Sequence, residues 1–296
     1  MSSTLQSLYD LTGLVALVTG GGTGIGLMIS QGLATNGAKV YITGRRKDVL
    51  DKVVAAWDQQ KGSLIAVQMD VTSRESITAV KTMIQEKEGK LHILVNNAGQ
   101  VGPTSPFLND RAAPEHKDAE SFGQGLFNES PSGWADVYAI NTFPIFFVTT
   151  AFLGLLDKGS RERESTTPGF TSSVINITSI SGLIRLAQDH FAYNSAKAAA
   201  SHLTKILATE CALKGVRVRV NAIAPGVYAS EMTADTIPPD MVESIGKGVM
   251  PVPAARSGTA QEMAGTVIYL ASPAGCYTNG QELVIDGGYI AVNPST

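Results

Sequence analysis

An apolar run that ends in a cluster of glycines constrains this chain more than any other feature of its sequence. Residues 14–26 read Leu-Val-Ala-Leu-Val-Thr-Gly-Gly-Gly-Thr-Gly-Ile-Gly, and a helix-like pattern of apolar residues follows at once. Glycines between a strand and a helix permit left-handed backbone angles and close approach of another molecule. A helix N-terminus also offers unpaired N–H groups to an anion. The pattern therefore predicts a strand, a pyrophosphate-binding turn and a helix.

The glycine spacing is Gly20-x-x-x-Gly24-x-Gly26, which departs from the strict Gly-x-Gly-x-x-Gly dinucleotide fingerprint. A plain flexible loop is the alternative, because glycine clusters are common in turns. The strand before the glycines and the helix after them favour the dinucleotide site over that alternative.

Short apolar segments alternate with amphipathic segments along the rest of the chain. This alternation predicts an α/β fold of Rossmann type, with a doubly wound parallel sheet of about seven strands, helices on both faces and a single domain over 1–296. Strands are expected at 14–19, 38–43, 63–68, 91–95, 172–178, 216–222 and 282–285. Helices are expected at 24–35, 47–59, 73–88, 132–156, 191–213 and 260–270.

Two segments interrupt this alternation and are interpreted as surface insertions. Residues 101–131 contain four prolines together with glycine and many charges, and residues 157–171 are polar and mixed in charge. The most apolar stretch, Phe143–Leu156, spans fourteen residues, is too short for a membrane span and predicts a buried or interface helix.

Charge and cysteine content exclude several classes of function. A net charge of −3 and an isoelectric point near 5.8 argue against nucleic acid as the main partner. Cys211 and Cys276 fit no disulfide framework or zinc spacing, and no His/Cys/Asp cluster suggests a metal. The first ten residues lack the basic start and apolar stretch of a signal peptide, so a reducing, cytoplasmic setting without a membrane is expected.

Tyr193 and Lys197 stand four residues apart in a helix-like segment, which places both side chains on one face. A cation near a phenol favours the phenolate, so the pair predicts a tyrosine whose pKa lies below its ordinary value of about 10. Such a tyrosine can exchange a proton near neutral pH, as general acid–base catalysis requires. A single pair of this spacing arises easily by chance and gains meaning only from the other motifs.

Three motifs occur in order: Thr19-Gly-Gly-Gly-Thr-Gly-Ile-Gly26, Asn96-Asn-Ala-Gly99 and Tyr193-x-x-x-Lys197. With them the chain resembles the single-domain branch of the short-chain dehydrogenase/reductase family, from about Leu11 to Ala291. The resemblance implies a nicotinamide coenzyme and a carbonyl or alcohol substrate, most similar to that of 3-oxoacyl-type or small-ketone reductases. It also implies that residues 228–253 form a segment that covers the substrate.

The resemblance implies a set of coenzyme-binding residues. These are Gly20, Thr23, Gly24, Ile25, Gly26, Asp70, Val71, Asn97, Ala98, Gly99, Tyr193, Lys197, Pro225, Gly226, Val227 and Ser230. Asn96 is expected to be largely structural. Asp70 has an alternative role as a cap of the following helix, which Thr72 or Ser73 could also provide.

Arg45 and Arg46 follow the second expected strand, and no acidic residue occurs there before Asp48. A carboxylate at this point would bind the adenosine ribose and repel a 2′-phosphate. Gly44 stands where NAD-using relatives often carry that acid, whereas a guanidinium suits a phosphate dianion. The sequence therefore favours NADP(H), with two ordinary surface arginines as the alternative.

The resemblance also implies four catalytic residues: Asn141, Ser179, Tyr193 and Lys197. In the family, the asparagine holds a water that links the lysine to solvent, the serine orients the carbonyl, and the lysine binds the nicotinamide ribose. Asn141 has a structural role as its alternative, and Ser181 remains an alternative to Ser179, since the gap from Ser179 to Tyr193 is fourteen residues. His190 and His202 match no family position and are interpreted as incidental.

These expectations combine into one hypothesis: NADPH-dependent, reversible reduction of a ketone or aldehyde, with Tyr193 as general acid. Helices at 132–156 and 191–213 are expected to pair between subunits of a homo-oligomer, a tetramer or a dimer, as the resemblance implies. The alternative is a dinucleotide-binding sensor or scaffold without catalysis. A serine hydrolase is excluded because no Gly-x-Ser-x-Gly motif occurs in the chain.

Overall fold

A computed structural model describes residues 5–58, 61–228 and 252–295 of the chain. Ser230, and nearly all of the expected substrate-covering segment 228–253, lie outside the described residues.

Seven parallel strands form one sheet in the order β3-β2-β1-β4-β5-β6-β7, which confirms the predicted fold class. The strands are β1 Val15–Thr19, β2 Lys39–Gly44, β3 Ser63–Gln68, β4 Ile93–Asn96, β5 Ser172–Ile177, β6 Val218–Pro225 and β7 Glu282–Ile285. The chain runs outward from β1 to β3 and then crosses back to pair β4 with β1. This change of direction opens a crevice at the carboxyl ends of β1 and β4, where ligands of open α/β sheets bind.

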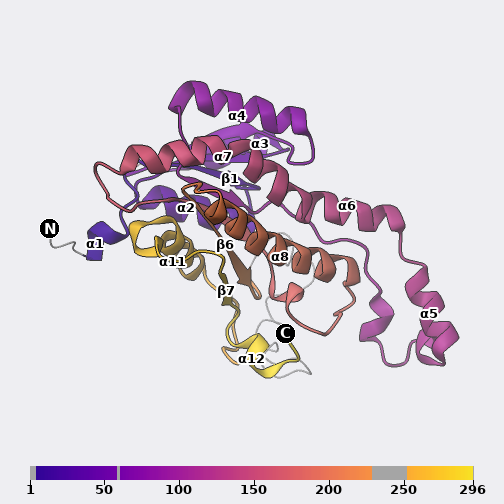
Figure 1. The fold of residues 1–296 in the computed structure, drawn as a ribbon. Helices are drawn as coiled ribbons and strands as arrows, with labels where there is room; N and C mark the ends of the chain where they lie inside the picture. Colours follow the sequence, from indigo (N-terminus) through magenta and orange to yellow (C-terminus); the bar gives the residue numbers. More distant parts are fainter. Residues whose placement is uncertain (1–4, 59–60, 229–251, 296) are drawn as a thin grey trace.

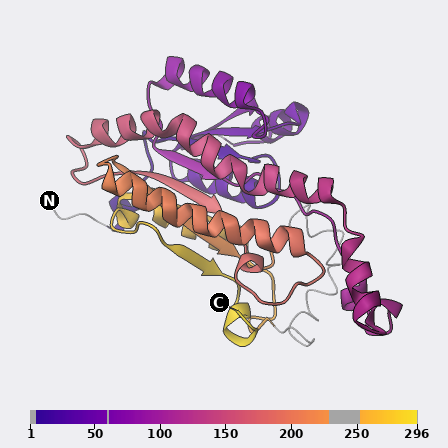
Figure 2. The same cartoon turned by 45° about the vertical axis from the view of Figure 1, so that its right-hand side comes forward.

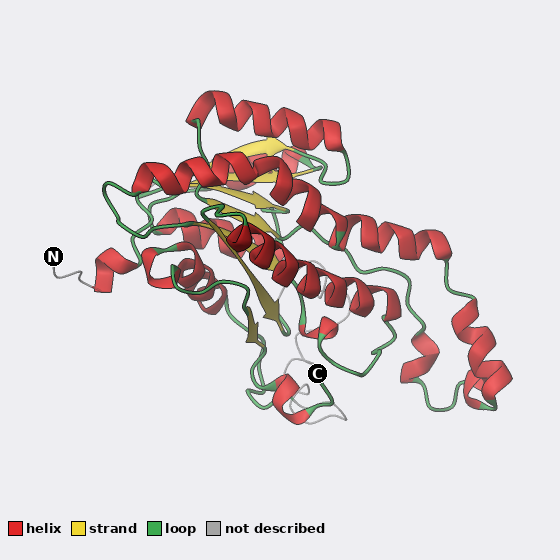
Figure 3. Cartoon of the chain, in the orientation of Figure 1, coloured by secondary structure: helices red, strands yellow, loops and turns green. Residues whose placement is uncertain are grey.

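Helices cover both faces of the sheet (Figures 1 and 3). They are α1 Leu5–Leu8, α2 Gly24–Thr35, α3 Lys47–Ala55, α4 Arg74–Glu88, α5 Ala119–Phe127, α6 Pro131–Asn141, α7 Phe143–Arg163, α8 Phe191–Leu213, α11 Ala260–Ala271 and α12 Tyr289–Val292. Core residues of α2, α3 and α11 share one apolar cluster, and those of α4, α7 and α8 share another.

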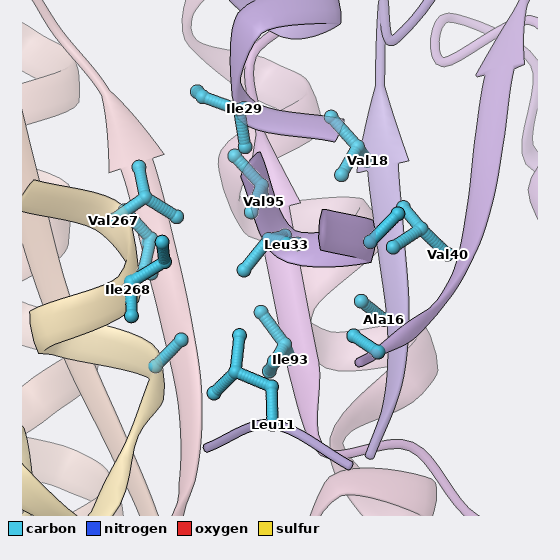
Figure 4. Packing of buried hydrophobic residues seen from close by; sticks show 14 of the residues in the cluster. Leu11, Ala16, Val18, Ile29, Leu33, Val40, Ile93, Val95, Val267 and Ile268 are labelled. Carbon is cyan, nitrogen blue, oxygen red and sulfur yellow. The ribbon is translucent and has the colours of Figure 1, made fainter. Parts of the chain in front are cut away.

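The two cores follow from the alternation of side chains along each strand. In β1, Ala16 and Val18 point into the cluster under α2 and α11, whereas Val15 and Leu17 point into the cluster under α7 and α8. Figure 4 shows the first cluster, in which Ile29 and Leu33 of α2 and Val267 and Ile268 of α11 pack together with residues of β1 and β4. Because both faces are covered, strands of this kind are continuously apolar, as the sequence of β1 is.

The single helix expected over 132–156 is two helices, α6 and α7, which meet at Thr142. Pro144 stands in the first turn of α7 and has no N–H group to donate to the end of α6, so the helical hydrogen bonds are interrupted there. The helix pattern in the sequence is continuous across this point, and the prediction was wrong about the break.

The expected insertion 157–171 is helical in its first half, because α7 continues to Arg163. Asp157 and Arg161 form an i,i+4 ion pair there, with Oδ2 and Nε 2.6 Å apart. Charged residues on an exposed helix end look the same in sequence as charged residues in a loop. Only residues 164–171 form the connection to β5.

The other insertion forms an arm, defined here as residues 101–130, that extends from the body of the molecule (Figures 1 and 2). It contains short 3-10 turns at Pro106–Asn109 and Pro114–His116 as well as α5, which has no buried residue. The rings of Phe107, His116 and Phe122 contact one another and stabilise its tip. The arm is therefore folded, although the sequence predicted only a proline-rich insertion.

The helical stretch Pro131–Arg163 reaches a mean hydropathy of 1.8, which by length and composition alone would suit a bilayer span. Of its most apolar window, 56% is buried within the protein, as in the core helix of a globular fold.

His92 is fully buried just before β4, at the opposite end of the strand from the crevice, and its Nδ1 accepts a hydrogen bond from the backbone N–H of Val15 at 3.0 Å. Burial, reinforced by the nearby charge of Arg163, lowers its pKa to about 4. In the unfolded chain the same group has a pKa near 6.5. The unfolded chain therefore takes up a proton below pH 6.5 that the folded chain resists until about pH 4.

Stability should accordingly fall as the pH drops from 6.5 to 4, by an upper limit of about 3 kcal/mol from this residue. Chemical denaturation across this range, for the natural chain and for His92→Gln, measures the effect. The substituted chain should show a shallower slope, whereas His202→Gln on the exposed face of α8 should match the natural chain. Equal slopes for His92→Gln and the natural chain would contradict the assignment.

Candidate active site

A crevice of about 1080 Å³ lies at the carboxyl ends of the strands. Every described residue that the sequence analysis assigned to coenzyme binding lines it, and Ser179 lines it as well. The lining comes from six strand ends, from the arm and from α12, so residues far apart in sequence meet there. Of the predicted catalytic residues, Asn141 alone is absent from the lining.

The glycine turn is shaped for close approach of a ligand. Gly20 and Gly24 have positive φ angles of 64° and 50°, which glycine adopts without strain. A Cβ atom on Gly26 would collide with the carbonyl oxygen of Gly20 and with the side chain of Asn97. That side chain donates hydrogen bonds to the carbonyls of Thr19 and Gly20 at 3.0 and 3.1 Å, and so fixes the turn to the end of β4.

The N-terminus of α2 opens into the crevice next to this turn. Thr23 stands at the cap position, but its side chain makes no capping hydrogen bond, and the first turn carries no acidic residue. The N–H groups of the first turn are therefore available to an anion, and the helix dipole favours one. The glycine turn and this helix end together fit the pyrophosphate of a dinucleotide.

Arg45, Arg46 and Asp70 line the far end of the crevice, beyond β2 and β3. Burial alone would raise the pKa of Asp70, but hydrogen bonds from Thr72 and the charge of Arg45 outweigh it and hold the pKa below its usual value. The cap of α4 is Ser73, whose hydroxyl accepts from the N–H of Ser76. The capping alternative for Asp70 therefore does not hold.

Asn96 is buried, and its side chain donates to Thr149 Oγ1 and Asn176 Oδ1 at 3.0 and 2.8 Å. These bonds join β4 to α7 and β5, in agreement with the structural role expected for this residue.

Tyr193 and Lys197 lie in the first turns of α8, with Lys197 Nζ 5.7 Å from the centre of the tyrosine ring. Lys197 is almost fully buried and donates to the carbonyl of Ile177 at 2.8 Å. Ser179 follows the end of β5, and its hydroxyl lies near enough to Tyr193 to lower the pKa of the phenol. Of the two candidate serines, it is thus Ser179 whose hydroxyl affects the pKa of the tyrosine, while Ser181 donates its backbone N–H to Ser179 Oγ.

A sequence model of the family described as "Enoyl-(Acyl carrier protein) reductase" matches residues 20–290. The short-chain dehydrogenase/reductase VdtF of Byssochlamys spectabilis is 39% identical over 310 residues, which cover 99% of this chain and 98% of that protein. The chain belongs to the short-chain dehydrogenase/reductase family. The resemblance seen in the three sequence motifs is confirmed.

Two further members of this family are informative. The 3-oxoacyl-acyl-carrier-protein reductase of rhamnolipid biosynthesis from Pseudomonas aeruginosa is 33% identical, with 96% of this chain and 99% of that protein covered. The solved RhlG/NADP active-site complex of Pseudomonas aeruginosa is 32% identical and superposes with a TM-score of 0.76, covering 96% of this chain and 98% of that chain.

The pKa values within this short-chain dehydrogenase/reductase differ from the sequence-based prediction. Burial raises the pKa of Tyr193, and the hydrogen bond from Ser179 lowers it only in part. Burial also lowers the pKa of Lys197, to about 8. The prediction of a lowered tyrosine pKa was wrong, because it considered the ammonium charge and not the loss of water around both groups.

Asn141 is buried at the end of α6 and forms two hydrogen bonds with the backbone of Gln100. Its Oδ1 accepts from the Gln100 N–H at 3.0 Å, and its Nδ2 donates to the Gln100 carbonyl at 2.8 Å. Asn141 thus fixes the segment that follows Gly99, as its structural alternative predicts. The water-binding role that the resemblance implies stays a prediction.

A group of crevice residues was not predicted from the sequence. Gln188, Asp189, His190 and Tyr289 all line the crevice, although His190 was interpreted as incidental. Gln188 and Asp189 belong to an irregular loop without periodicity, and Tyr289 follows the last strand, over a hundred residues away in sequence. The only available signal was the cluster of three polar residues, Gln-Asp-His, just before the tyrosine helix.

Proposed function

We propose that this protein is an NADPH-dependent reductase of ketones or aldehydes that also works in reverse as an alcohol dehydrogenase. The observation that carries the proposal is the meeting of Ser179, Tyr193 and Lys197 in the same crevice as the glycine turn. A binding protein has no need of a partly buried phenol beside a buried hydroxyl and a buried ammonium at its coenzyme site.

The protein groups supply orientation and a proton. Hydride is the chemistry that bound NADPH contributes. The hydroxyls of Ser179 and Tyr193, two residues that line the same crevice, hold the carbonyl oxygen of the substrate between them. A raised pKa keeps Tyr193 protonated at neutral pH, so that it can give its proton to the developing alkoxide. The ammonium of Lys197 then stabilises the phenolate that remains.

The preference for NADPH rests on Arg45 and Arg46, which line the crevice after β2 where an acid would otherwise select NADH. The solved RhlG structure is a complex with NADP, which supports the same choice for this chain.

Replacing Arg45 with aspartate should reverse this preference. The carboxylate would repel a 2′-phosphate and accept from a ribose hydroxyl, so we expect the ratio of kcat/KM for NADPH to that for NADH to fall about 100-fold. Steady-state kinetics with both coenzymes measures the ratio. Arg111→Asp, the same change on the exposed arm, should leave it unaltered. A natural chain that prefers NADH would contradict the proposal for Arg45 and Arg46.

The proposed activity is tested by mixing the chain with NADPH and a panel of ketones and aldehydes while following coenzyme absorbance. Consumption that depends on the carbonyl compound supports the reductase. The sensor or scaffold would instead be favoured if NADPH bound tightly but was not oxidised with any carbonyl compound, and if no alcohol reduced NADP⁺ in the reverse direction.

We also propose a homo-oligomer assembled through α7 and α8. Exposed apolar side chains gather on these two helices: Phe143, Phe146 and Phe147 on α7, and Phe191, Ile206 and Leu213 on α8. Exposed apolar patches of this kind mark interaction surfaces. Light scattering of the purified chain tests the proposal, and a monomeric mass at micromolar concentration would contradict it.

A further inference from the structure

Two consecutive residues at the substrate end of the crevice have left-handed backbone angles without being glycine. Gln188 has φ 50° and Asp189 has φ 63°. Residues other than glycine rarely adopt left-handed backbone angles. Those that do are held there by the surrounding structure, and they cluster at functional sites.

Contacts from three parts of the chain hold this loop in place. The backbone N–H of Ser105 in the arm donates to the carbonyl of Asp189 at 2.9 Å. Gln188 Nε2 donates to the hydroxyl of Tyr289 in α12 at 2.9 Å. Asn194 Nδ2 in α8 donates to the two carbonyls just before the loop, at 3.1 and 3.0 Å. The position of Asp189 is thus fixed from the arm, the C-terminal segment and the catalytic helix.

Asp189 forms a pair with His190 beside the catalytic tyrosine. Its Oδ1 lies 3.1 Å from His190 Nε2, and the imidazole ring meets the ring of Tyr193 edge to face with centroids 6.4 Å apart. Both members of the pair line the crevice. Within the described ranges, Oδ2 of Asp189 makes no hydrogen bond, so it is available to a ligand in the crevice.

The chemistry of the pair selects what it can bind. A carboxylate oxygen only accepts hydrogen bonds, so the ligand must provide a donor. The imidazole next to Asp189 compensates part of its charge, which favours a neutral donor over an ammonium group. A ligand carboxylate would be repelled by Asp189, because among the described residues the pKa of Asp189 shows the influence of the His190 charge but of no arginine or lysine.

We propose that Asp189, oriented by His190, is a substrate-binding residue that accepts a hydrogen bond from a hydroxyl group of the substrate. The site then takes hydroxylated ketones in preference to ketones that lack a hydroxyl donor. This inference rests on the proposed reductase activity and specifies its substrate class. Tyr193 and Ser179 hold the reacting carbonyl, and Asp189 fixes the remainder of the molecule.

The test compares matched pairs of substrates that differ in one donor. The probes are 2′-, 3′- and 4′-hydroxyacetophenone and the three corresponding methoxyacetophenones, with NADPH as coenzyme. Because a good charge-assisted hydrogen bond changes affinity by about 10- to 100-fold, at least one hydroxylated probe should exceed its methoxy partner in kcat/KM by that factor. Asp189→Asn should reduce this ratio to within about twofold.

Asparagine suits the test because it tolerates left-handed backbone angles at least as well as aspartate, so the loop should be retained. Asp136→Asn, the same change at an exposed position of α6, is the control and should leave the ratio as in the natural chain. Equal kcat/KM for all hydroxy and methoxy partners, or a preference that survives Asp189→Asn, would overturn the inference.

Failure of the reductase proposal gives a different result. If no carbonyl compound is reduced, the same probes are titrated into the complex with NADPH, and binding is followed by coenzyme fluorescence. A hydroxyl preference that Asp189→Asn removes would then still support Asp189 as the binding residue. Equal binding of hydroxy and methoxy probes would overturn it.

Discussion

Replacement of Tyr193 by phenylalanine is expected to lower kcat about 10²- to 10⁴-fold, the range that a positioned general acid contributes. The substitution removes the hydroxyl from the crevice that Ser179 also lines, and keeps the ring that lies beside Lys197. Coenzyme affinity should change by no more than about twofold, because the glycine turn and the N-terminus of α2 are untouched. Single-turnover kinetics and NADPH fluorescence titration measure the two quantities separately.

Tyr277→Phe is the matched control, since it removes the same hydroxyl from a fully exposed side chain. Its kcat should equal that of the natural chain. A Tyr193→Phe variant with full activity would refute the assignment of the acid, whereas a variant that loses activity and NADPH affinity together would point to a structural role for Tyr193.

Local patterns in the sequence were enough to predict the sheet. Each strand is a short apolar run, as in Val15–Thr19, and both faces are covered, so the pattern is strong and the boundaries differ by three residues or fewer. The prediction of one helix over 132–156 was wrong because the apolar pattern continues across Pro144, although a proline can also stand in the first turn of a new helix. The choice between these depends on how α6 and α7 pack on the sheet.

The crevice was predictable where a motif binds a common chemical group. Gly20, Gly24 and Gly26 stand in a turn whose geometry follows from residue type alone. The proposed substrate end of the crevice was not predictable. Asp189 is positioned there by a hydrogen bond from Ser105, and its neighbour Gln188 by a hydrogen bond to Tyr289. These contacts join segments more than eighty residues apart and have no periodic signature in the sequence.

The direction of the Tyr193 pKa shift could not be predicted from the sequence either. The spacing of Tyr193 and Lys197 predicts an attractive charge interaction, which lowers the pKa of the phenol. Burial of both groups is a property of the folded crevice, and it raises the pKa of the phenol and lowers that of the amine. The fold therefore decides which effect dominates, and for both groups the effect of burial is the larger one.

Replacement of Gly26 by alanine is expected to abolish most coenzyme binding. The new Cβ would collide with the backbone carbonyl of Gly20, which no side-chain rotation can relieve, so the glycine turn must move. Overpacking of this kind costs about 1–3 kcal/mol of folding free energy. Displacing two N–H groups from an anion costs about 3 kcal/mol of binding, which corresponds to roughly 100-fold in affinity. Fluorescence titration with NADPH and denaturant unfolding measure the two losses.

Gly265→Ala provides the matched control, because Gly265 lies in α11 and a Cβ there would meet nothing within 4 Å. Alanine is the better helix former, so this variant should be more stable by about 0.5–1 kcal/mol, with unchanged NADPH affinity. Replacing glycine by alanine is thus expected to lower the stability of the protein at position 26 and to raise it at position 265. If Gly26→Ala bound NADPH as tightly as the natural chain, the turn between β1 and α2 could not be the pyrophosphate site, and the proposed function would lose its coenzyme.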